Sequence, residues 1–204
     1  MVLTLGFLGA NAQSIYKVNL QELKNFEGTY AYGENSTLQI AASPTDTVLY
    51  ALIGAAKYKL RPYAKDIFLN NGNQEVKFIR HGNKIEGYKV KDGQPDKLYK
   101  LLSSNVTFSD NMWYPRSPGS KYKYATPAKK NDGLSTGPLT GSGLDIGLIN
   151  KMIERITDGT YPNVHSILIV KDGKLILEEY FYEYDANTLH QLRSASKTFI
   201  SAMT

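Results

Sequence analysis

Between positions 28 and 102, short apolar segments alternate with turn residues, and this pattern limits the region to a β fold. In one segment Val76 and Phe78 alternate with Lys77, which is the period of two expected of a half-buried strand. The predicted strands are Gly28–Tyr32, Thr37–Ala41, Val48–Ile53, Tyr58–Pro62, Ile67–Leu69, Glu75–Arg80, Lys84–Val90 and Leu98–Leu101.

The turns between these strands carry the residues that tight hairpins need, at Asn71-Gly72, His81-Gly82-Asn83 and Asp92-Gly93. The chain also contains 15 tyrosines, and aromatic side chains pack well on sheet surfaces. Short strands joined by tight turns favour an antiparallel meander that closes into a small barrel or a curved sheet.

Residues 1–12 are an apolar run that closes on Ala10-Asn11-Ala12, a small-x-small pattern typical of signal-peptide cleavage. This run predicts an exported protein, periplasmic or secreted, whose mature chain begins near Gln13. The alternative is a short buried strand or an N-terminal tail. The run is too short to cross a bilayer as a helix. A short helix is predicted over 14–26.

Residues 103–142 are rich in Pro and Gly, show no periodicity and predict a linker or an extended arm. After it, Asp145 is placed to cap a helix whose apolar residues recur at helical spacing up to Gly159. A hairpin follows, with strands at 166–170 and 174–181 around the turn Lys171-Asp172-Gly173.

The Ser-x-x-Lys spacing is a candidate nucleophile-and-base pair and occurs three times in the chain. A serine hydroxyl becomes a good nucleophile when a nearby base takes its proton, and residues three apart on a helix share a face. The lysine must be uncharged to act as that base, which burial or neighbouring cations favour. The three pairs are Ser14 with Lys17, Ser120 with Lys123, and Ser194 with Lys197.

Only the pair Ser194 and Lys197 precedes a run with helical spacing, formed by Phe199, Ile200 and Met203. Ser14 lies next to the predicted leader, and Ser120 lies among prolines and lysines. A serine at a helix N-terminus also gains from the free N–H groups there, which favour a developing oxyanion. The alternative is that Ser194 is only a helix cap, a role for which serine is a preferred residue.

Three stretches carry a resemblance to a known family: Gly143-Leu144-Asp145, the run from Tyr161 to Leu175, and Leu192 to Phe199. Together they resemble the serine β-lactamase and penicillin-binding-protein-like superfamily, and are closest to its class C-like esterases, D-aminopeptidases and amide hydrolases. The order of helix, hairpin and Ser-x-x-Lys helix is the same as in that family.

The resemblance implies that Ser194 is the acylated nucleophile and Lys197 its proton acceptor. The family also uses a Tyr-x-Asn motif and a Lys- or His-x-Gly motif after the serine helix. Tyr161-Pro162-Asn163 matches the first by letter but precedes Ser194, and we interpret it as a turn. The β region is similar to small β domains that accompany such hydrolases, although those usually follow the catalytic part.

The fold class predicted from these patterns is α+β. A small antiparallel barrel-like or curved-sheet domain at 14–102 comes first, and the linker or arm at 103–142 follows it. Residues 143–204 then form the truncated start of a β-lactamase-like α/β serine hydrolase domain.

Composition narrows the chemistry of the candidate sites. With no cysteine, the chain has no disulfide or thiolate metal site, and His81, His165 and His190 lie too far apart in sequence to suggest metal ligands. The net charge of +5 is spread along the chain without a nucleic-acid motif, so no nucleic-acid partner is predicted. Glu178 and Glu179 are adjacent on a strand, point to opposite faces and are interpreted as surface charge.

The sequence therefore predicts part of a serine hydrolase that needs no metal or organic cofactor and acts on a small-molecule or peptide-like acyl substrate, a β-lactam, ester or amide. The 204-residue piece itself is expected to be inactive. The alternative is an exported binding protein whose β-lactamase-like domain is degenerate and non-catalytic.

Overall fold

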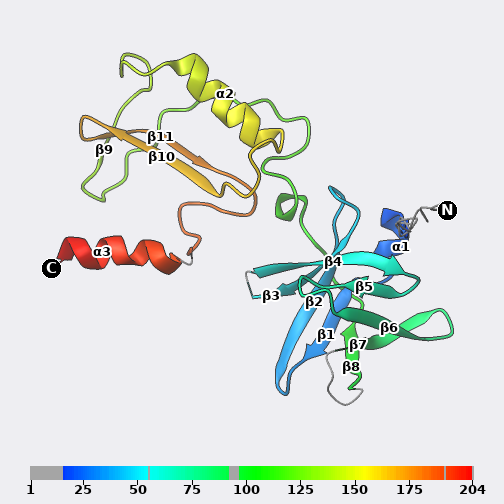
Figure 1. Cartoon of the computed structure of the whole chain (residues 1–204). Helices are drawn as coiled ribbons and strands as arrows, with labels where there is room; N and C mark the ends of the chain where they lie inside the picture. The colour runs from blue at the N-terminus through cyan, green and yellow to red at the C-terminus, as the bar shows by residue number, and fades with distance from the viewer. Residues whose placement is uncertain (1–15, 55, 92–96, 191, 204) are drawn as a thin grey trace, which may run out of the picture. The chain divides into compact units, whose positions relative to one another are not determined.

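A computed structural model describes residues 16–54, 56–91, 97–190 and 192–203 of the chain (Figure 1). The predicted leader at 1–12, Ser14 and the turn Asp92-Gly93 lie outside these residues. The chain divides into two compact units, Met1–Phe108 and Ser109–Thr204, and each is described by itself. Each helix in the described ranges is too short or too polar to cross a lipid bilayer.

The first unit is a closed antiparallel barrel, formed by eight strands within the residues described. Each strand pairs with the next, and the last returns to the first through the pairs Thr29 with Ser103 and Tyr30 with Leu101. All eight predicted strands are confirmed, with small shifts at their ends. They are β1 (Gly28–Tyr32), β2 (Ser36–Ala42), β3 (Leu49–Ile53), β4 (Ala56–Ala64), β5 (Ile67–Leu69), β6 (Glu75–His81), β7 (Lys84–Val90) and β8 (Tyr99–Ser103).

One short helix, α1 (Leu20–Lys24), precedes the barrel and is shorter than the helix predicted over 14–26. Asn19 and Glu22 set its start by a reciprocal capping box, in which each side chain accepts a hydrogen bond from the other's backbone N–H at 2.9–3.0 Å. Leu23 is fully buried and ties the helix to the barrel core.

Aromatic side chains fill the interior of the barrel. The Phe78 ring centroid lies 4.8 Å from that of Phe26, 5.6 Å from Phe68 and 5.8 Å from Tyr30. The Tyr30 hydroxyl donates a hydrogen bond to the Phe26 carbonyl at 2.7 Å, and burial raises the pKa of Tyr30 well above its usual value. An eight-stranded barrel is just wide enough for side chains to fill, so this interior is a packed core.

Two glycines allow β8 to close the barrel. At Gly28 of β1, an added Cβ would lie 2.5 Å from Leu101 Cδ1 and 2.7 Å from the Ser103 carbonyl oxygen. At Gly87 of β7, it would overlap the Tyr99 carbonyl oxygen and lie 3.0 Å from the Lys100 Cα. The strands on either side of β8, β1 and β7, therefore each have a glycine at the point where the backbone of β8 comes closest.

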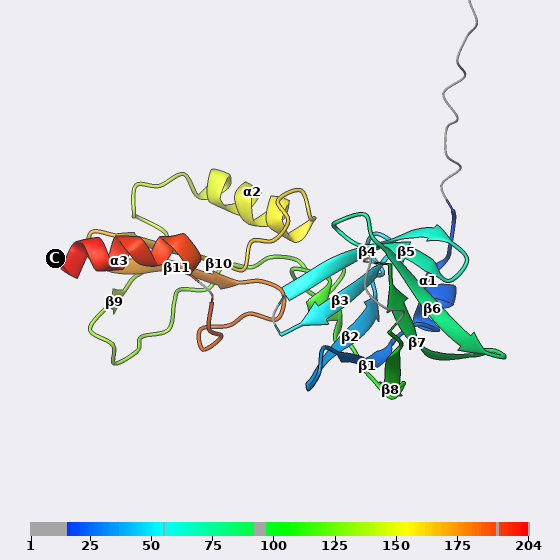
Figure 2. The ribbon, with the colours of Figure 1, turned by 60° about the horizontal axis from the view of Figure 1, so that its bottom comes forward.

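The second unit is built on a three-stranded sheet with the order β10, β11, β9. The predicted hairpin is confirmed as β10 (Ser166–Lys171) and β11 (Lys174–Tyr180), and β9 (Ser135–Thr136) pairs with β11 in parallel. In Figure 2 the helix α2 (Ile146–Thr157) lies along this sheet. Its isoleucines 149, 153 and 156 are buried in one cluster with Ile176 and Leu177.

Both ends of α2 follow the sequence signals. Asp145 accepts a hydrogen bond from the backbone N–H of Leu148 at 3.0 Å, which confirms the predicted N-cap. Gly159 follows the helix with a positive φ of 82°.

Residues 109–142 belong to the second unit and include the short helix η1 (Asp110–Met112). The Tyr124 hydroxyl donates to the Ile176 carbonyl at 3.0 Å and accepts from the Leu139 N–H at 2.8 Å. Tyr122 and Tyr124 also pack against the buried cluster around α2. Most of the segment predicted as a linker or arm thus contributes to this unit's own fold.

The predicted fold class is wrong. The structure is mainly an eight-stranded closed antiparallel barrel, and the described part of the chain contains three α-helices. After the barrel come a three-stranded sheet, one helix packed on it, and the helices η2 (Arg193–Ala195) and α3 (Ser196–Met203), of which α3 buries no residue. The motifs of the predicted hydrolase domain are local, whereas a layered α/β domain needs helices packed over a larger sheet.

Candidate functional site

The predicted catalytic pair lies where the chain enters its last described helix. Ser194 is in η2, and Lys197 is the second residue of α3. The backbone N–H of Ala195 donates to the Leu192 carbonyl at 2.9 Å, which closes the 3-10 turn around Ser194. Ser194 and Lys197 are three positions apart across the junction of η2 and α3, the spacing at which two residues share one face of a helix.

The surroundings of this pair are open. Every residue of α3 is exposed, including Phe199 at 61%, Ile200 at 63% and Met203 at 84% of their surface. Ser194 is exposed as well, and no hydrogen bond between Ser194 and Lys197 is found in this described stretch. The apolar residues of α3 are therefore uncovered in the part of the chain that the structure describes.

The other matches to family motifs have structural roles. Asn163 of Tyr161-Pro162-Asn163 has a positive φ of 62°, and its N–H donates to the Tyr182 hydroxyl at 3.3 Å. The Tyr161 N–H donates to the Arg155 carbonyl at the end of α2 at 2.8 Å. The predicted turn is thus confirmed, and it joins α2 to the hairpin.

Glu178 and Glu179 were interpreted as surface charges, at least one of them solvated, but both side chains are largely buried in ion pairs. Glu179 is ion-paired with Arg116 and accepts from the Tyr122 hydroxyl at 3.0 Å, and its side chain is 12% exposed. Glu178 is paired with Lys130 at 2.6 Å, and this contact lowers the Glu178 pKa. The two carboxylates anchor the 109–142 segment to β11, because the cations that they pair with, Arg116 and Lys130, both belong to that segment.

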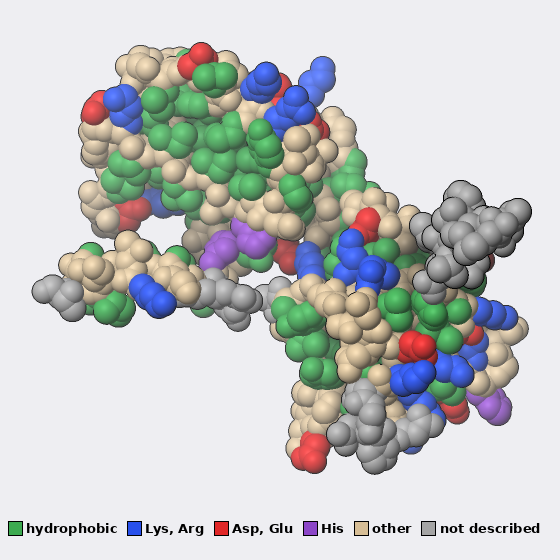
Figure 3. Space-filling model, in the orientation of Figure 1, with side chains coloured by type: hydrophobic (Ala, Val, Ile, Leu, Met, Phe, Trp, Pro, Cys, Tyr) green, Lys and Arg blue, Asp and Glu red, His purple; other side chains and the backbone are tan. Residues whose placement is uncertain are grey.

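Two histidines that lie 25 positions apart in the sequence meet in the second unit. The ring of Tyr184 stacks on His165 at 3.8 Å and on His190 at 4.5 Å, and the two imidazole centroids are 5.4 Å apart. Histidine atoms accordingly form one patch on this unit's surface (Figure 3). The hairpin explains the meeting, since it brings its two flanks together and Phe181 donates to the His165 carbonyl at 2.9 Å.

These histidines do not complete a metal centre from the residues described, since no group of three or more His, Cys, Asp or Glu side chains gathers there or elsewhere in that part of the chain. Sequence reasoning missed the pair because contact across a hairpin's flanks depends on strand register, which spacing alone does not give.

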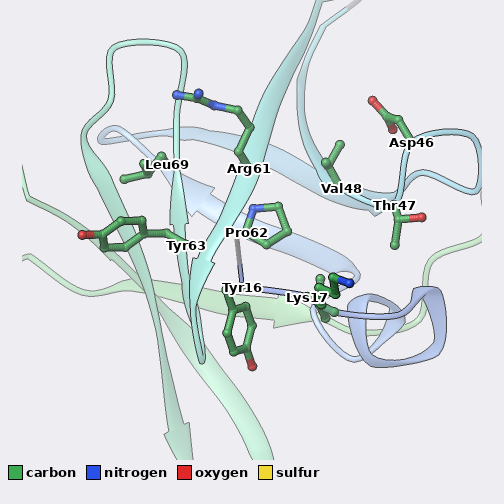
Figure 4. Close-up of a pocket in the computed structure, with 10 residues that line it drawn as sticks. Tyr16, Lys17, Asp46, Thr47, Val48, Arg61, Pro62, Tyr63 and Leu69 are labelled. Carbon is green, nitrogen blue, oxygen red and sulfur yellow. The ribbon is translucent and has the colours of Figure 1, made fainter. Parts of the chain in front are cut away.

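The barrel unit carries a pocket on its outside, with a volume of about 680 Å³. Figure 4 shows the side chains of Lys17, Thr47, Arg61 and Tyr63 arranged around Pro62. The pocket is formed by the segment before α1, the loop before β3, and β4 and β5. Its lining residues are Tyr16, Lys17, Val18, Asp46, Thr47, Val48, Arg61, Pro62, Tyr63 and Leu69.

No family model, curated protein or solved structure matches this chain. The function must therefore be inferred from the residues themselves, above all from the Ser194–Lys197 pair and the barrel pocket.

The carboxylate at the pocket rim is already neutralised. Asp46 lies 2.7 Å from the Lys59 ammonium and accepts from the Tyr50 hydroxyl at 3.0 Å. Partial burial by itself would raise the pKa of Asp46, but hydrogen bonds from Lys59, Ser43 and Tyr50 outweigh it, and the pKa lies below its ordinary value of 3.8.

This depressed pKa predicts an acid-sensitive contribution to barrel stability. Asp46→Asn should lower the unfolding free energy by about 0.5–1 kcal/mol at pH 7. The loss should shrink as the pH falls below 3.8, because the wild-type carboxylate is protonated as the pH passes through its folded pKa. Urea titrations followed by NMR signals of barrel amides, at pH 7 and pH 3, measure it.

Asp172→Asn is the matched control, because Asp172 lies in the hairpin turn of the second unit with 83% of its side chain exposed. An equal loss for Asp46→Asn at both pH values would contradict the role given to the carboxylate.

Proposed function

We propose that the protein is a serine hydrolase related to the β-lactamases and penicillin-binding proteins, with Ser194 as its nucleophile and Lys197 as the proton acceptor. The observation that carries the proposal is the position of these two residues, three apart at the turn that begins an amphipathic helix. The predicted export, to the periplasm or outside the cell, is part of the same proposal and rests on residues 1–12.

In the proposed reaction, Ser194 Oγ attacks the carbonyl carbon of a β-lactam, ester or amide, and its proton passes to the uncharged Lys197 amine. The bond from the carbonyl carbon to the leaving nitrogen or oxygen breaks, the leaving group takes up a proton, and the acyl group stays on Ser194. Water then hydrolyses this ester and restores the hydroxyl. The backbone N–H of Ser194 supplies one donor for the oxyanion.

The described surroundings of Ser194 do not complete such a site. Oxyanion donors and a general base act strongly where water is excluded, and the whole of α3 is exposed. We therefore propose that activity requires other protein surface packed against Phe199, Ile200 and Met203, and that the 204-residue chain by itself is inactive.

A fluorophosphonate probe for active serines tests this function. The whole natural protein should be labelled, and Ser194→Ala should abolish the labelling. Lys197→Ala should slow it by about 100-fold or more, because general-base assistance contributes on that order.

Ser120→Ala is the matched control, since Ser120 and Lys123 have the same spacing in an irregular segment, and labelling should be unchanged. Equal labelling of the wild type and Ser194→Ala would reject the nucleophile. It would favour the alternative, an exported binding protein with a degenerate, non-catalytic domain.

A further inference from the structure

The imidazoles of His165 and His190 are metal-ligating side chains that the proposed hydrolase chemistry leaves unused. They come from the two flanks of the β10–β11 hairpin, and their ring centroids lie 5.4 Å apart. Figure 3 shows histidine atoms gathered in one patch on the surface of the second unit. A ligand that binds both rings would therefore join the start of the hairpin to the segment 182–190, which follows it.

The separation of the two rings fits a shared metal ion. Two imidazoles on one tetrahedral Zn²⁺, with metal–nitrogen distances of about 2.1 Å, have ring centroids roughly 5 Å apart. The planes of His165 and His190 differ by 36°, and their distance is wider than the 3.8 Å stack of His165 on Tyr184. The two imidazoles thus lie beside each other rather than face to face, an arrangement in which one ion can bind at the edges of both rings.

Neighbouring groups orient the two rings. Tyr184 stacks on both of them, and Tyr182 meets His165 edge-to-face at 6.3 Å between centroids. The Nδ1 atom of His190 lies 3.2 Å from the Thr188 carbonyl oxygen. Since a carbonyl only accepts hydrogen bonds, the neutral His190 ring carries its proton on Nδ1 and keeps its lone pair on Nε2. A backbone carbonyl orients metal-ligating histidines in the same way.

The donor set selects the kind of metal. Two neutral imidazoles suit Zn²⁺, Ni²⁺ and Cu²⁺, whereas Mg²⁺ and Ca²⁺ prefer oxygen ligands. Asp185, a carboxylate of the same loop, already accepts hydrogen bonds from the Asn187 N–H and the Thr188 hydroxyl, each at 2.8 Å.

The coordination of such an ion would be completed by water. Within the described ranges, no third His, Cys, Asp or Glu side chain joins the two imidazoles. His190 is exposed and His165 is half-buried, so an ion with its bound waters can reach the pair. With only two protein ligands, the ion exchanges readily.

We propose that His165 and His190 together bind one Zn²⁺ ion, or a similar divalent transition-metal ion, which fastens the segment 182–190 to the hairpin. The inference goes beyond the proposed hydrolase and does not depend on it. Ser194→Ala should accordingly bind zinc as the wild type does.

A titration of the whole chain with ZnCl₂ at about pH 7.5, followed by the NMR signals of the imidazole nitrogens, tests this site. The signals of His165 and His190 should shift together and saturate at one ion per chain. His165→Gln and His190→Gln should each weaken binding at the remaining ring by about 10-fold or more, because a chelate binds more tightly than either ligand alone.

His81 is the matched control, since it is an exposed histidine at the end of β6 in the barrel. Its signal should respond only at the higher zinc concentrations that a single imidazole needs, and His81→Gln should leave the affinity of the pair unchanged. MgCl₂ should shift none of the histidine signals. Circular dichroism establishes that each variant stays folded.

Joint saturation of the two rings, lost in both single variants, would support the site. Independent titration of His165 and His190 with the weak affinity of His81 would overturn it, and so would the absence of any zinc-dependent shift at either ring. The labelling of Ser194 is measured separately, so failure of the zinc site and failure of the hydrolase are distinguishable.

Discussion

Phe78→Ala should lower the free energy of unfolding of the barrel by about 3–5 kcal/mol. The Phe78 side chain is 2% exposed and meets the rings of Phe26, Tyr30 and Phe68 edge-on, with Tyr88 at 6.1 Å between centroids. Truncation removes apolar burial and leaves a cavity that these large rings cannot readily fill. The edge-to-face contacts, each worth about 0.5–1.5 kcal/mol beyond buried area, are lost as well.

The measurement is a urea titration followed by NMR signals of barrel amides, which separates the barrel from the second unit. Tyr58→Ala is the control, because Tyr58 is an aromatic residue of β4 that is 45% exposed, and it should change stability by less than about 1 kcal/mol. A loss for Phe78→Ala no greater than that of the control would show that the aromatic cluster does not hold the barrel together.

Gly87→Ala should cost the barrel about 2–3 kcal/mol, although it adds only one methyl group. The new Cβ would overlap the Tyr99 carbonyl oxygen and press on the Lys100 Cα, and both are backbone atoms of β8. Backbone atoms cannot rotate away as a side chain can, so β7 and β8 must separate where they pair. Amide exchange should therefore accelerate in β8 before it does elsewhere.

Gly72→Ala is the matched control. A Cβ at Gly72 meets only the ends of the Asn70 and Gln74 side chains, at 3.4 and 3.8 Å, so stability should change by less than about 1 kcal/mol. Wild-type exchange rates in β8 of Gly87→Ala would refute the close approach of the two strands.

The strands could be predicted because their signals are local. Alternation such as Val76, Lys77 and Phe78, ended by Gly82, needs only neighbouring residues to be recognised. The closing pair of Thr29 with Ser103 and the parallel pair of Leu175 with Thr136 join distant segments, and no local pattern specifies them. The fold class was wrongly predicted for the same reason: local motifs such as a hairpin and a helix do not determine how many further layers surround them.

For the candidate sites too, features formed by neighbouring residues could be predicted from the sequence, and features formed by distant segments could not. Ser194 and Lys197 are neighbours along the chain, so spacing alone brings them together, but it does not reveal that α3 is uncovered. The barrel pocket joins three separate stretches around Lys17, Thr47 and Arg61, and becomes visible only once the barrel has closed. The pairing of Glu179 with Arg116 likewise depends on how residues 109–142 fold back onto β11.

The pairing of β1 with β8 also has a consequence for biosynthesis. A ribosome releases the chain from its N-terminus, so β1 keeps one row of backbone N–H and C=O groups without a partner strand until Ser103 has emerged. The nascent barrel thus presents an open edge during most of its translation, and such an edge can pair with strands of other chains.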